Sequence, residues 1–311
     1  MYSLTYWGAA DTLIRAHRRG VKVHVLLNSE GAGYKQARLL REGLGSNLKA
    51  RSWVVVRTDA VRMHSKFLLV SRRGKAGPAI WVSSGNITAS NGRDQANEAL
   101  ITTGDSKLYD FLMTQFTLMR KGVTSPKKLA RSVITPSAAL QTFPLPRGGA
   151  ANDPVLAALN DITCVTATGR TTVRMAQLFL TVERIHLIKR LRKLAAEGCD
   201  VKVVGHMRGW NPTTQQKLVA PGAGYVQLRS AQGRILHTKI TTIQGWDAAG
   251  EPLMLALAGS HNLSGRALTV TPEGVNDELL MRIWNTATVR TYSAWVDMVI
   301  RKHSTVVKHR T

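Results

Sequence analysis

Cysteine is scarce in this 311-residue chain, which has only Cys164 and Cys199. Two cysteines are too few for a disulfide scaffold or a cysteine-rich zinc cluster. Both belong to one predicted strand–helix–strand unit, each a few residues before a strand. They are expected either to form a single disulfide, which would mean an oxidising compartment, or to remain as two buried thiols.

Long hydrophobic runs are missing as well. No stretch of about 18 apolar residues occurs, so we expect no transmembrane helix. No secretory signal is visible, although the disulfide alternative favours a secreted protein. The segment 1–5 already has the pattern of a β-strand, and we therefore expect further sequence upstream of Met1.

Acidic residues are few: 19 Asp and Glu stand against 43 Lys and Arg, a formal net charge of +24. Such an excess attracts polyanions, namely nucleic acid, an anionic membrane surface, or both. The alternative is that the charge only keeps a basic protein soluble. Charge alone does not separate these alternatives.

An internal repeat organises the chain. Both halves show a strand, a helix, a glycine and a second strand, at 1–5, 10–18, Gly20 and 21–27, and at 173–179, 185–196, Gly198 and 201–204. The helices carry apolar residues at three- and four-residue spacing. Both glycines are expected to end their helices in a left-handed conformation. Strand–helix–strand order predicts a right-handed parallel crossover.

The remaining elements also recur in both halves. Each half continues with a helix (33–42 and 212–219), a further strand (99–102 and 279–282) and a final amphipathic helix (108–119 and 288–300). We predict an α/β fold of two similar lobes related by a pseudo-twofold axis, each a mixed, mostly parallel sheet flanked by helices. The first lobe is 1–120, a proline-rich and largely extended connector is 121–154, and the second lobe is 155–311, with a frayed basic tail at 301–311.

Each half contains a His-x-Lys segment followed by a small-residue turn with an asparagine. The two sets are His64, Lys66 and Asn86, and His237, Lys239 and Asn262. On a strand, side chains at i and i+2 share one face, so each histidine should emerge beside its lysine. Lysine ammoniums and asparagine amides can neutralise a phosphoryl group in the transition state. One imidazole can attack phosphorus while the other protonates the leaving alkoxide.

A nucleophilic imidazole must be neutral and oriented, which a carboxylate bonded to its other ring nitrogen achieves. Two glutamates are candidates for this role. Glu98 and Glu278 each lie just before a strand and downstream of the asparagine turn of their own half. Their matching placement favours this role over that of a surface charge.

These residues resemble the phospholipase D superfamily, whose signature is H-x-K-x4-D followed by G-S-x-N, twice per active site. The resemblance covers nearly the whole chain and implies a site between the lobes, with both motifs converging on one phosphorus atom. It further implies that His64 is the nucleophile and His237 the general acid, with the reverse assignment open. The reaction is then metal-independent phosphodiester cleavage through a phosphohistidine.

The chain departs from that signature at three positions. Ser71 and Gln244 replace the two aspartates, and Ser83 replaces the leading glycine of the first turn. The lost aspartates weaken assignment to the standard lipase branch more than they weaken the catalytic interpretation.

Other residues are assigned to the substrate or to no site. Ser84, Ser260, His261 and Trp7 are candidate substrate contacts, although turn or packing roles are the alternatives. No histidines have the spacing of a zinc site with Cys or carboxylate partners, so neither a metal nor another cofactor is expected.

Three functions follow from these observations. The first is a phospholipase D-type enzyme that hydrolyses phospholipids or transfers the phosphatidyl group, with a phospholipid or anionic membrane surface as partner. The second is a nuclease, favoured by the net charge and by 27 arginines. The third is a non-catalytic polyanion-binding protein. We expect a monomer, because both motifs lie in one chain.

Overall fold

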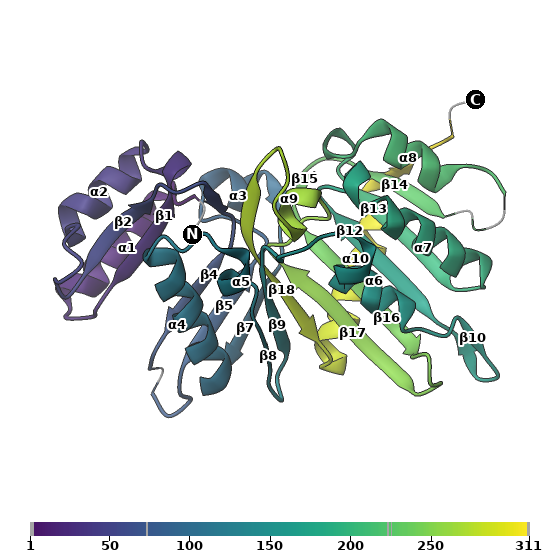
Figure 1. Ribbon diagram of the computed structural model, residues 1–311, viewed down its shortest axis with the longest axis horizontal. Helices are drawn as coiled ribbons and strands as arrows, with labels where there is room; N and C mark the ends of the chain where they lie inside the picture. The colour runs from purple at the N-terminus through teal and green to yellow at the C-terminus, as the bar shows by residue number, and fades with distance from the viewer. Residues whose placement is uncertain (1–2, 73, 223, 225, 310–311) are drawn as a thin grey trace.

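The computed structural model describes residues 3–72, 74–222, 224 and 226–309. It is a mixed α/β fold in which the halves lie side by side (Figure 1). The first half contains α1 (Trp7–Arg18), β1 (His24–Asn28), η1 (Ser29–Gly31), α2 (Lys35–Leu44), β2 (Trp53–Arg57), β3 (Val61–Met63), β4 (Phe67–Val70), β5 (Ala79–Ser83), α3 (Ala89–Arg93), β6 (Gln95–Ala96), β7 (Ala99–Thr103) and α4 (Ser106–Arg120).

The second half repeats this order. Its elements are α6 (Pro154–Asn160), β10 (Val165–Thr166), β11 (Gly169–Arg170), β12 (Thr172–Gln177), η3 (Val182–Arg184), α7 (Ile185–Ala196), β13 (Asp200–Gly205), η4 (Met207–Gly209), α8 (Pro212–Val219), β14 (Gln227–Ala231), β15 (Ile235–Leu236), β16 (Lys239–Trp246), β17 (Pro252–Gly259), α9 (Gly265–Leu268), β18 (Val275–Ile283), α10 (Thr286–Lys302) and β19 (Ser304–Val306). Most predicted helices and strands are thereby confirmed; the expected strand at 1–5 is not, because residues 1–2 lie outside the described part and Leu4 forms only a bridge with Ile87.

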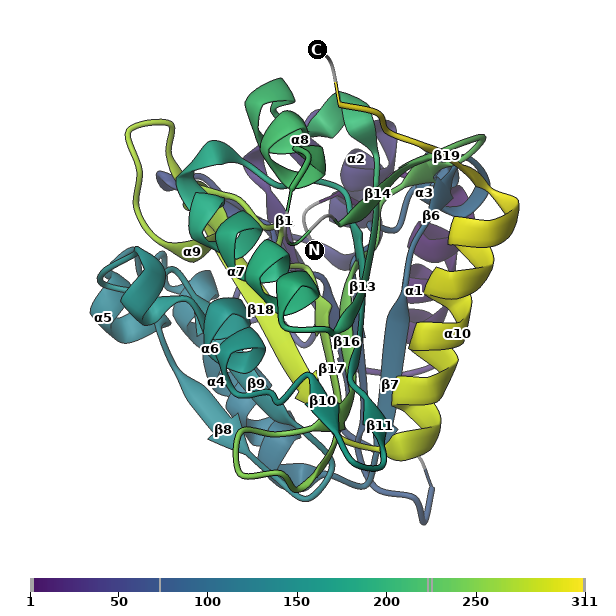
Figure 2. The ribbon, with the colours of Figure 1, turned by 90° about the vertical axis from the view of Figure 1, so that its right-hand side faces the viewer.

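The central sheet belongs mainly to the second half, in the order β19-β14-β13-β12-β16-β17-β18-β9-β8, with β3 beside β18. Figure 2 shows α10 on one face and α6 and α7 on the other. The first half has a parallel pair, β1–β2, and an antiparallel sheet, β4-β5-β7. Among the described strands, parallel pairs occur in the strand–helix–strand units and in two short cross-pairs, and the other strand pairs are antiparallel. The sheets are therefore less parallel than expected.

The connector does more than join the halves. It contains α5 (Pro126–Leu129), β8 (Ser132–Ile134), β9 (Ala139–Phe143) and η2 (Ala150–Asn152), and β9 pairs antiparallel with β18. The tail is also more ordered than predicted, because β19 pairs with β14. The expectation of a frayed tail is wrong as far as residue 306, and residues 310–311 lie outside the described part.

The two predicted helix ends are confirmed. Gly20 has φ 91° and Gly198 has φ 94°. In each case the following amide closes the turn: Val21 N donates to Ala16 O, and Cys199 N to Leu194 O. This six-residue bond is the Schellman pattern, which favours glycine because a side chain is strained at such φ values.

Candidate active site

The halves exchange short strands at the site. β3 pairs in parallel with the start of β18, and β15 pairs in parallel with β6. The amide of His64 donates to Asp277 O at 3.0 Å, and that of His237 donates to Ala96 O at 2.9 Å. Each histidine therefore lies next to the polar segment of the other half.

His64 is bonded to the predicted glutamate of the second half. Its Nδ1 lies 2.8 Å from Glu278 Oε1, with the glutamate side chain fully buried and the histidine 12% exposed. Glu278 also accepts from Ser260 Oγ at 2.6 Å and from Asn276 Nδ2 at 2.9 Å. When Nδ1–H donates a hydrogen bond to the carboxylate, the lone pair of the neutral ring is on Nε2.

Electrostatics keep this pair as neutral imidazole and carboxylate near pH 7. Burial lowers the pKa of His64 to about 4, even though Glu278 acts in the opposite direction. Burial alone would raise the pKa of Glu278, but His64 and Lys66 outweigh it and lower that pKa. A neutral, oriented imidazole is the state that a nucleophile requires.

The ring of His237 is bonded to an amide and not to either candidate glutamate. Its Nδ1 lies 2.9 Å from Asn97 Oδ1, not from Glu98. The Asn97 amide is oriented in turn, because its Nδ2 donates to Asn91 O at 3.0 Å. Glu98 instead accepts the backbone N–H of Lys239 at 3.2 Å. Of the two candidate glutamates, Glu278 bonds a histidine ring and Glu98 bonds the backbone of Lys239.

The reason is a one-residue difference in register between the halves. Ser84 N donates to Glu98 O, whereas Ser260 N donates to Leu279 O. The same serines also accept through Oγ from the amides of Glu98 and Leu279. Glu98 thus corresponds to Leu279, and Asn97 occupies the position of Glu278.

Both lysines turn back on their own histidines. Lys66 Nζ donates to His64 O, and Lys239 Nζ donates to His237 O at 2.6 Å. The His-x-Lys segments are not within strands as predicted, since residues 64–66 and 237–238 lie at strand breaks. Burial lowers the pKa of Lys66 well below its usual range and that of Lys239 to about 8.

The asparagines of the two turns have buried amide oxygens. Asn86 Oδ1 and Asn262 Oδ1 have no hydrogen-bond partner among the described residues. Since buried polar atoms normally have partners, such atoms suit a bound polar ligand. Asn86 also lines an open pocket of about 290 Å³ together with Tyr6, Trp81, Asn91 and Asn97.

The remaining predicted substrate contacts are placed elsewhere. The hydroxyls of Ser84 and Ser260 bond the Glu98 and Glu278 segments, so they hold those segments. His261 is 1% exposed, with its ring 4.4 Å from Phe143. Trp7 is absent from the pocket lining; its ring lies 5.3 Å from Lys35 Nζ, and Tyr6 lines the pocket instead.

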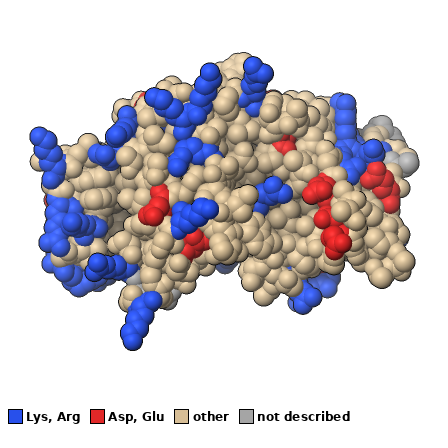
Figure 3. Space-filling model, turned by 60° about the horizontal axis from the view of Figure 1, so that its bottom comes forward, with Lys and Arg blue, Asp and Glu red and all other residues tan. Residues whose placement is uncertain are grey.

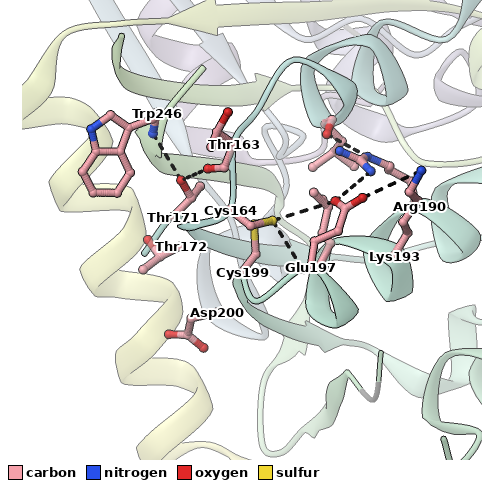
Figure 4. The surroundings of a disulfide bond; sticks show 12 residues. Thr163, Cys164, Thr171, Thr172, Arg190, Lys193, Glu197, Cys199, Asp200 and Trp246 are labelled. Atoms are coloured by element: carbon pink, nitrogen blue, oxygen red, sulfur yellow. Dashed lines mark hydrogen bonds and ion pairs between the residues drawn. A yellow bond between two sulfur atoms is a disulfide. The ribbon is translucent and has the colours of Figure 1, made fainter. Parts of the chain in front are cut away.

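Cys164 and Cys199 form a disulfide across the strand–helix–strand unit (Figure 4). Both side chains are buried, and the bond joins the segment before β10 to the start of β13. Of the two alternatives that the sequence left open, the structure has the bonded one.

Two groups important to the site gave no signal in the sequence analysis. Asn97 has no distinctive sequence pattern, because only the strand register places it at the position of Glu278. The buried Arg184 bonds Asp153 through Nε at 2.8 Å and reaches Asn262 O at 3.3 Å, which supports the second turn.

Among the described residues, no group of three His, Cys, Asp or Glu side chains could hold a metal ion. No helix in the described ranges is long and apolar enough to cross a bilayer.

A family model described as "Cardiolipin synthase, PLD-like domain" matches residues 1–120 and 165–300. The chain belongs to this phospholipase D-like family. Members of the superfamily act on phosphodiesters, and the predicted family and fold are confirmed. No curated protein matches the chain.

Solved structures share the fold at low sequence identity. Polyphosphate kinase from Porphyromonas gingivalis matches with a TM-score of 0.67 and 14% identity, over 99% of this chain and 43% of the kinase. Phosphatidylserine synthase from Haemophilus influenzae Rd KW20 matches with a TM-score of 0.62 and 12% identity, over 99% of this chain and 81% of the synthase. The chain therefore spans less than half of the kinase. Nuc from Salmonella typhimurium, a phospholipase D family member, matches 55% of this chain with a TM-score of 0.41 and 20% identity.

Proposed function

We propose that the chain cleaves phospholipids at the phosphodiester and passes the phosphatidyl group to water or an alcohol. The observation that carries this proposal is the crossed pairing of His64 with Glu278 and of His237 with Asn97, beside two buried lysines. The family description and the fold shared with a phosphatidylserine synthase support a lipid substrate.

The carboxylate favours His64 as the nucleophile. Its Nε2 forms a bond to phosphorus while the bond from phosphorus to the head-group oxygen breaks. His237 gives a proton to the departing alkoxide. Because burial and the nearby lysines lower its pKa, the ring takes up this proton when the anionic phosphodiester binds beside it and favours the charged form. Glu278 stabilises the positive charge that develops on the His64 ring, and the lysines offset charge on the phosphoryl oxygens.

The second step reverses the roles. Water or an alcohol gives its proton to His237, its oxygen attacks phosphorus, and the bond from phosphorus to His64 Nε2 breaks. In this scheme His64, Lys66, Asn86, His237, Lys239 and Asn262 contact the reacting group, while Glu278 and Asn97 position the histidines. Glu98 holds the backbone of Lys239.

A parallel assay tests the proposal. Purified protein in EDTA is offered phosphatidylcholine and phosphatidylglycerol vesicles with ethanol, plasmid DNA and RNA. We expect phosphatidylethanol to form, and His64→Asn to abolish it. A reaction of His237→Asn that is quenched with detergent at neutral pH, where the phosphorus–nitrogen bond of a phosphohistidine survives, should retain labelled phosphatidyl on the protein. Full lipid activity in His64→Asn would contradict the nucleophile assignment.

A nuclease is the second candidate, favoured by the net charge of +24. Figure 3 shows Lys and Arg side chains spread over one face, with few Asp and Glu among them. Cleavage of DNA or RNA without lipid activity would support it, and binding without turnover would support a polyanion-binding protein.

We also propose that the protein is secreted. The disulfide between Cys164 and Cys199 supports an oxidising compartment.

A further inference from the structure

The segment that carries His64 is fixed by side chains as well as by backbone pairing. Met63 N, just before it, donates to Asn28 Oδ1 at 2.9 Å. Ser65 Oγ, just after it, donates to Asp277 Oδ1 at 3.1 Å. The amide of His64 donates to the main-chain oxygen of Asp277 at 3.0 Å. Asp277 therefore holds this segment through both its backbone and its carboxylate.

The carboxylate of Asp277 is held in turn by a buried ion pair between the halves. Arg57 Nη1 lies 2.7 Å from Asp277 Oδ2, and the two side chains are 2% and 0% exposed. Arg57 also bonds Asp59 through Nε at 2.6 Å and Val123 O through Nη2 at 2.8 Å. Burial raises the pKa of Asp277, and Arg57 acts against that rise. The guanidinium therefore favours the charged carboxylate, which is the stronger acceptor for Ser65.

Neighbouring residues of β18 thus hold the backbone and the ring of the same histidine. Asp277 accepts from the His64 amide, and Glu278 bonds Nδ1 of the His64 ring at 2.8 Å. A rotation of the peptide between His64 and Ser65 would turn the ring away from its line of attack. A displacement of about 1 Å at such a group can lower the rate by about 10²-fold.

The second half has no carboxylate at the corresponding position. Because Asn97 occupies the position of Glu278, Ala96 occupies that of Asp277. The backbone there is held by β12 instead, since Leu178 N donates to Thr238 O at 3.1 Å. The ion pair therefore distinguishes the segment of the proposed nucleophile from the equivalent segment of the repeat.

We propose that Asp277 and Arg57 are positioning residues for His64. Asp277 fixes the backbone of His64 and Ser65, and Arg57 fixes the carboxylate of Asp277. This inference rests on the proposed function, in which His64 attacks phosphorus. Neither side chain bonds the ring of His64, so both act through its backbone. The rate of attack depends on alignment more steeply than binding does, so loss of the pair should lower kcat much more than it raises KM.

A double variant separates positioning from stability. Arg57→Met/Asp277→Leu removes both charges together, and replacing a buried ion pair by apolar residues is often neutral or stabilising. The main-chain bond of residue 277 to the His64 amide is retained. Asp59, the other carboxylate beside Arg57, is 19% exposed and can be solvated. Urea unfolding establishes that the double variant is folded. We expect its kcat to fall at least about tenfold.

The matched control makes the same two substitutions at an exposed ion pair. Asp11 and Arg15 lie 3.2 Å apart on α1, with side chains 55% and 60% exposed. Arg15→Met/Asp11→Leu should leave kcat unchanged, because a surface pair of this kind contributes little.

A smaller change tests the same contact without disturbing the ion pair. Ser65→Ala removes only the hydroxyl that donates to Asp277, and it should lower kcat about threefold or more. Ser65→Thr keeps a hydroxyl, as Thr238 does in the second half, and should restore most of the lost rate. If the double variant does not fold, this pair of variants decides the question.

Proton NMR gives a measurement that does not depend on turnover. The Nδ1 proton of His64, bonded to Glu278, should give a downfield signal that His64→Asn lacks. This signal should shift or broaden in the double variant and in Ser65→Ala, and it should stay in place in the surface control. An unchanged signal in both site variants, or an unchanged kcat in both, would overturn the proposal. A wild-type protein without turnover would contradict the proposed function, and the NMR signal would still test the positioning role.

Discussion

At the scale of single residues, the two histidines differ in the group that holds them. A carboxylate stabilises an imidazolium by charge, whereas an amide only fixes the tautomer. Burial and the nearby lysines lower the pKa of His237 further. His64 is therefore suited to carry the positive charge of a phosphohistidine, and a protonated His237 is suited to give its proton away.

Replacing Asn97 by glutamate tests this difference. Asn97→Glu should raise the pKa of His237 by about 1–3 units, because an opposite charge next to a titrating group favours its charged form. The alkaline limb of the pH profile of kcat/KM should therefore move to higher pH. Asn160→Glu, at an exposed position at the end of α6, is the matched control. An unchanged limb in Asn97→Glu would show that His237 is not the general acid.

The buried His261 is expected to make the folded protein less stable at acid pH. Its buried ring has no hydrogen-bond partner among the described residues, and burial lowers its pKa from 6.5 to about 3. A histidine with a lowered folded pKa binds protons first in the unfolded state, so stability is lost as pH falls below about 6.5. Between pH 6.5 and 5 this loss amounts to about 2 kcal/mol for one such group.

His261→Phe should remove that part of the pH dependence, because phenylalanine does not titrate and can still pack on Phe143. Urea unfolding of both proteins at pH 7 and pH 5 measures it. The difference in unfolding free energy between the two pH values should be smaller in His261→Phe. An equal difference would mean that His261 is protonated in the folded protein.

At the scale of elements, sequence patterns located what depends on local chemistry. Apolar spacing and the two helix-ending glycines predicted α1 and α7, and the repeated motif identified the histidines, lysines and asparagines of the candidate site. Strand register was not predictable, because Asn97 and Glu278 match only through long-range hydrogen bonds. Other features were not predictable for the same reason, because they depend on contacts that no local pattern encodes. These are the crossed pairs β3–β18 and β15–β6, the β8–β9 hairpin and the position of β19 at the edge of the central sheet.

The disulfide belongs to this scale, since it closes a strand–helix–strand unit with a sequence separation of 35. Loop-closure entropy for a loop of this length corresponds to about 3–4 kcal/mol. Cys164→Ser/Cys199→Ser should lower the urea midpoint by that amount divided by the m-value. Activity at 25 °C should persist, because neither cysteine contacts the site residues. The reduced wild-type protein is the control, and an unshifted midpoint would contradict the entropic account.

At the scale of the whole molecule, a buried site coexists with a strongly basic surface. Lys66, Lys239 and Glu278 are nearly inaccessible, whereas most other Lys and Arg side chains are exposed. Surface charge of one sign concentrates an anionic substrate near the protein without contacting the reacting atoms. Binding to a membrane should therefore depend on the surface charge, whereas turnover should depend on the groups of the buried site.

Salt separates these two responses. Screening shortens the reach of surface charges from about 10 Å at 0.1 M to about 3 Å at 1 M, while buried groups are screened much less. Binding to vesicles rich in phosphatidylglycerol should fall steeply over this range, and binding to neutral vesicles should be weak throughout. Turnover of a monomeric short-chain phospholipid should change little, because it needs no charged surface. If turnover of that monomer falls as steeply as vesicle binding, the basic surface would be part of the catalytic site and not only a means of recruitment.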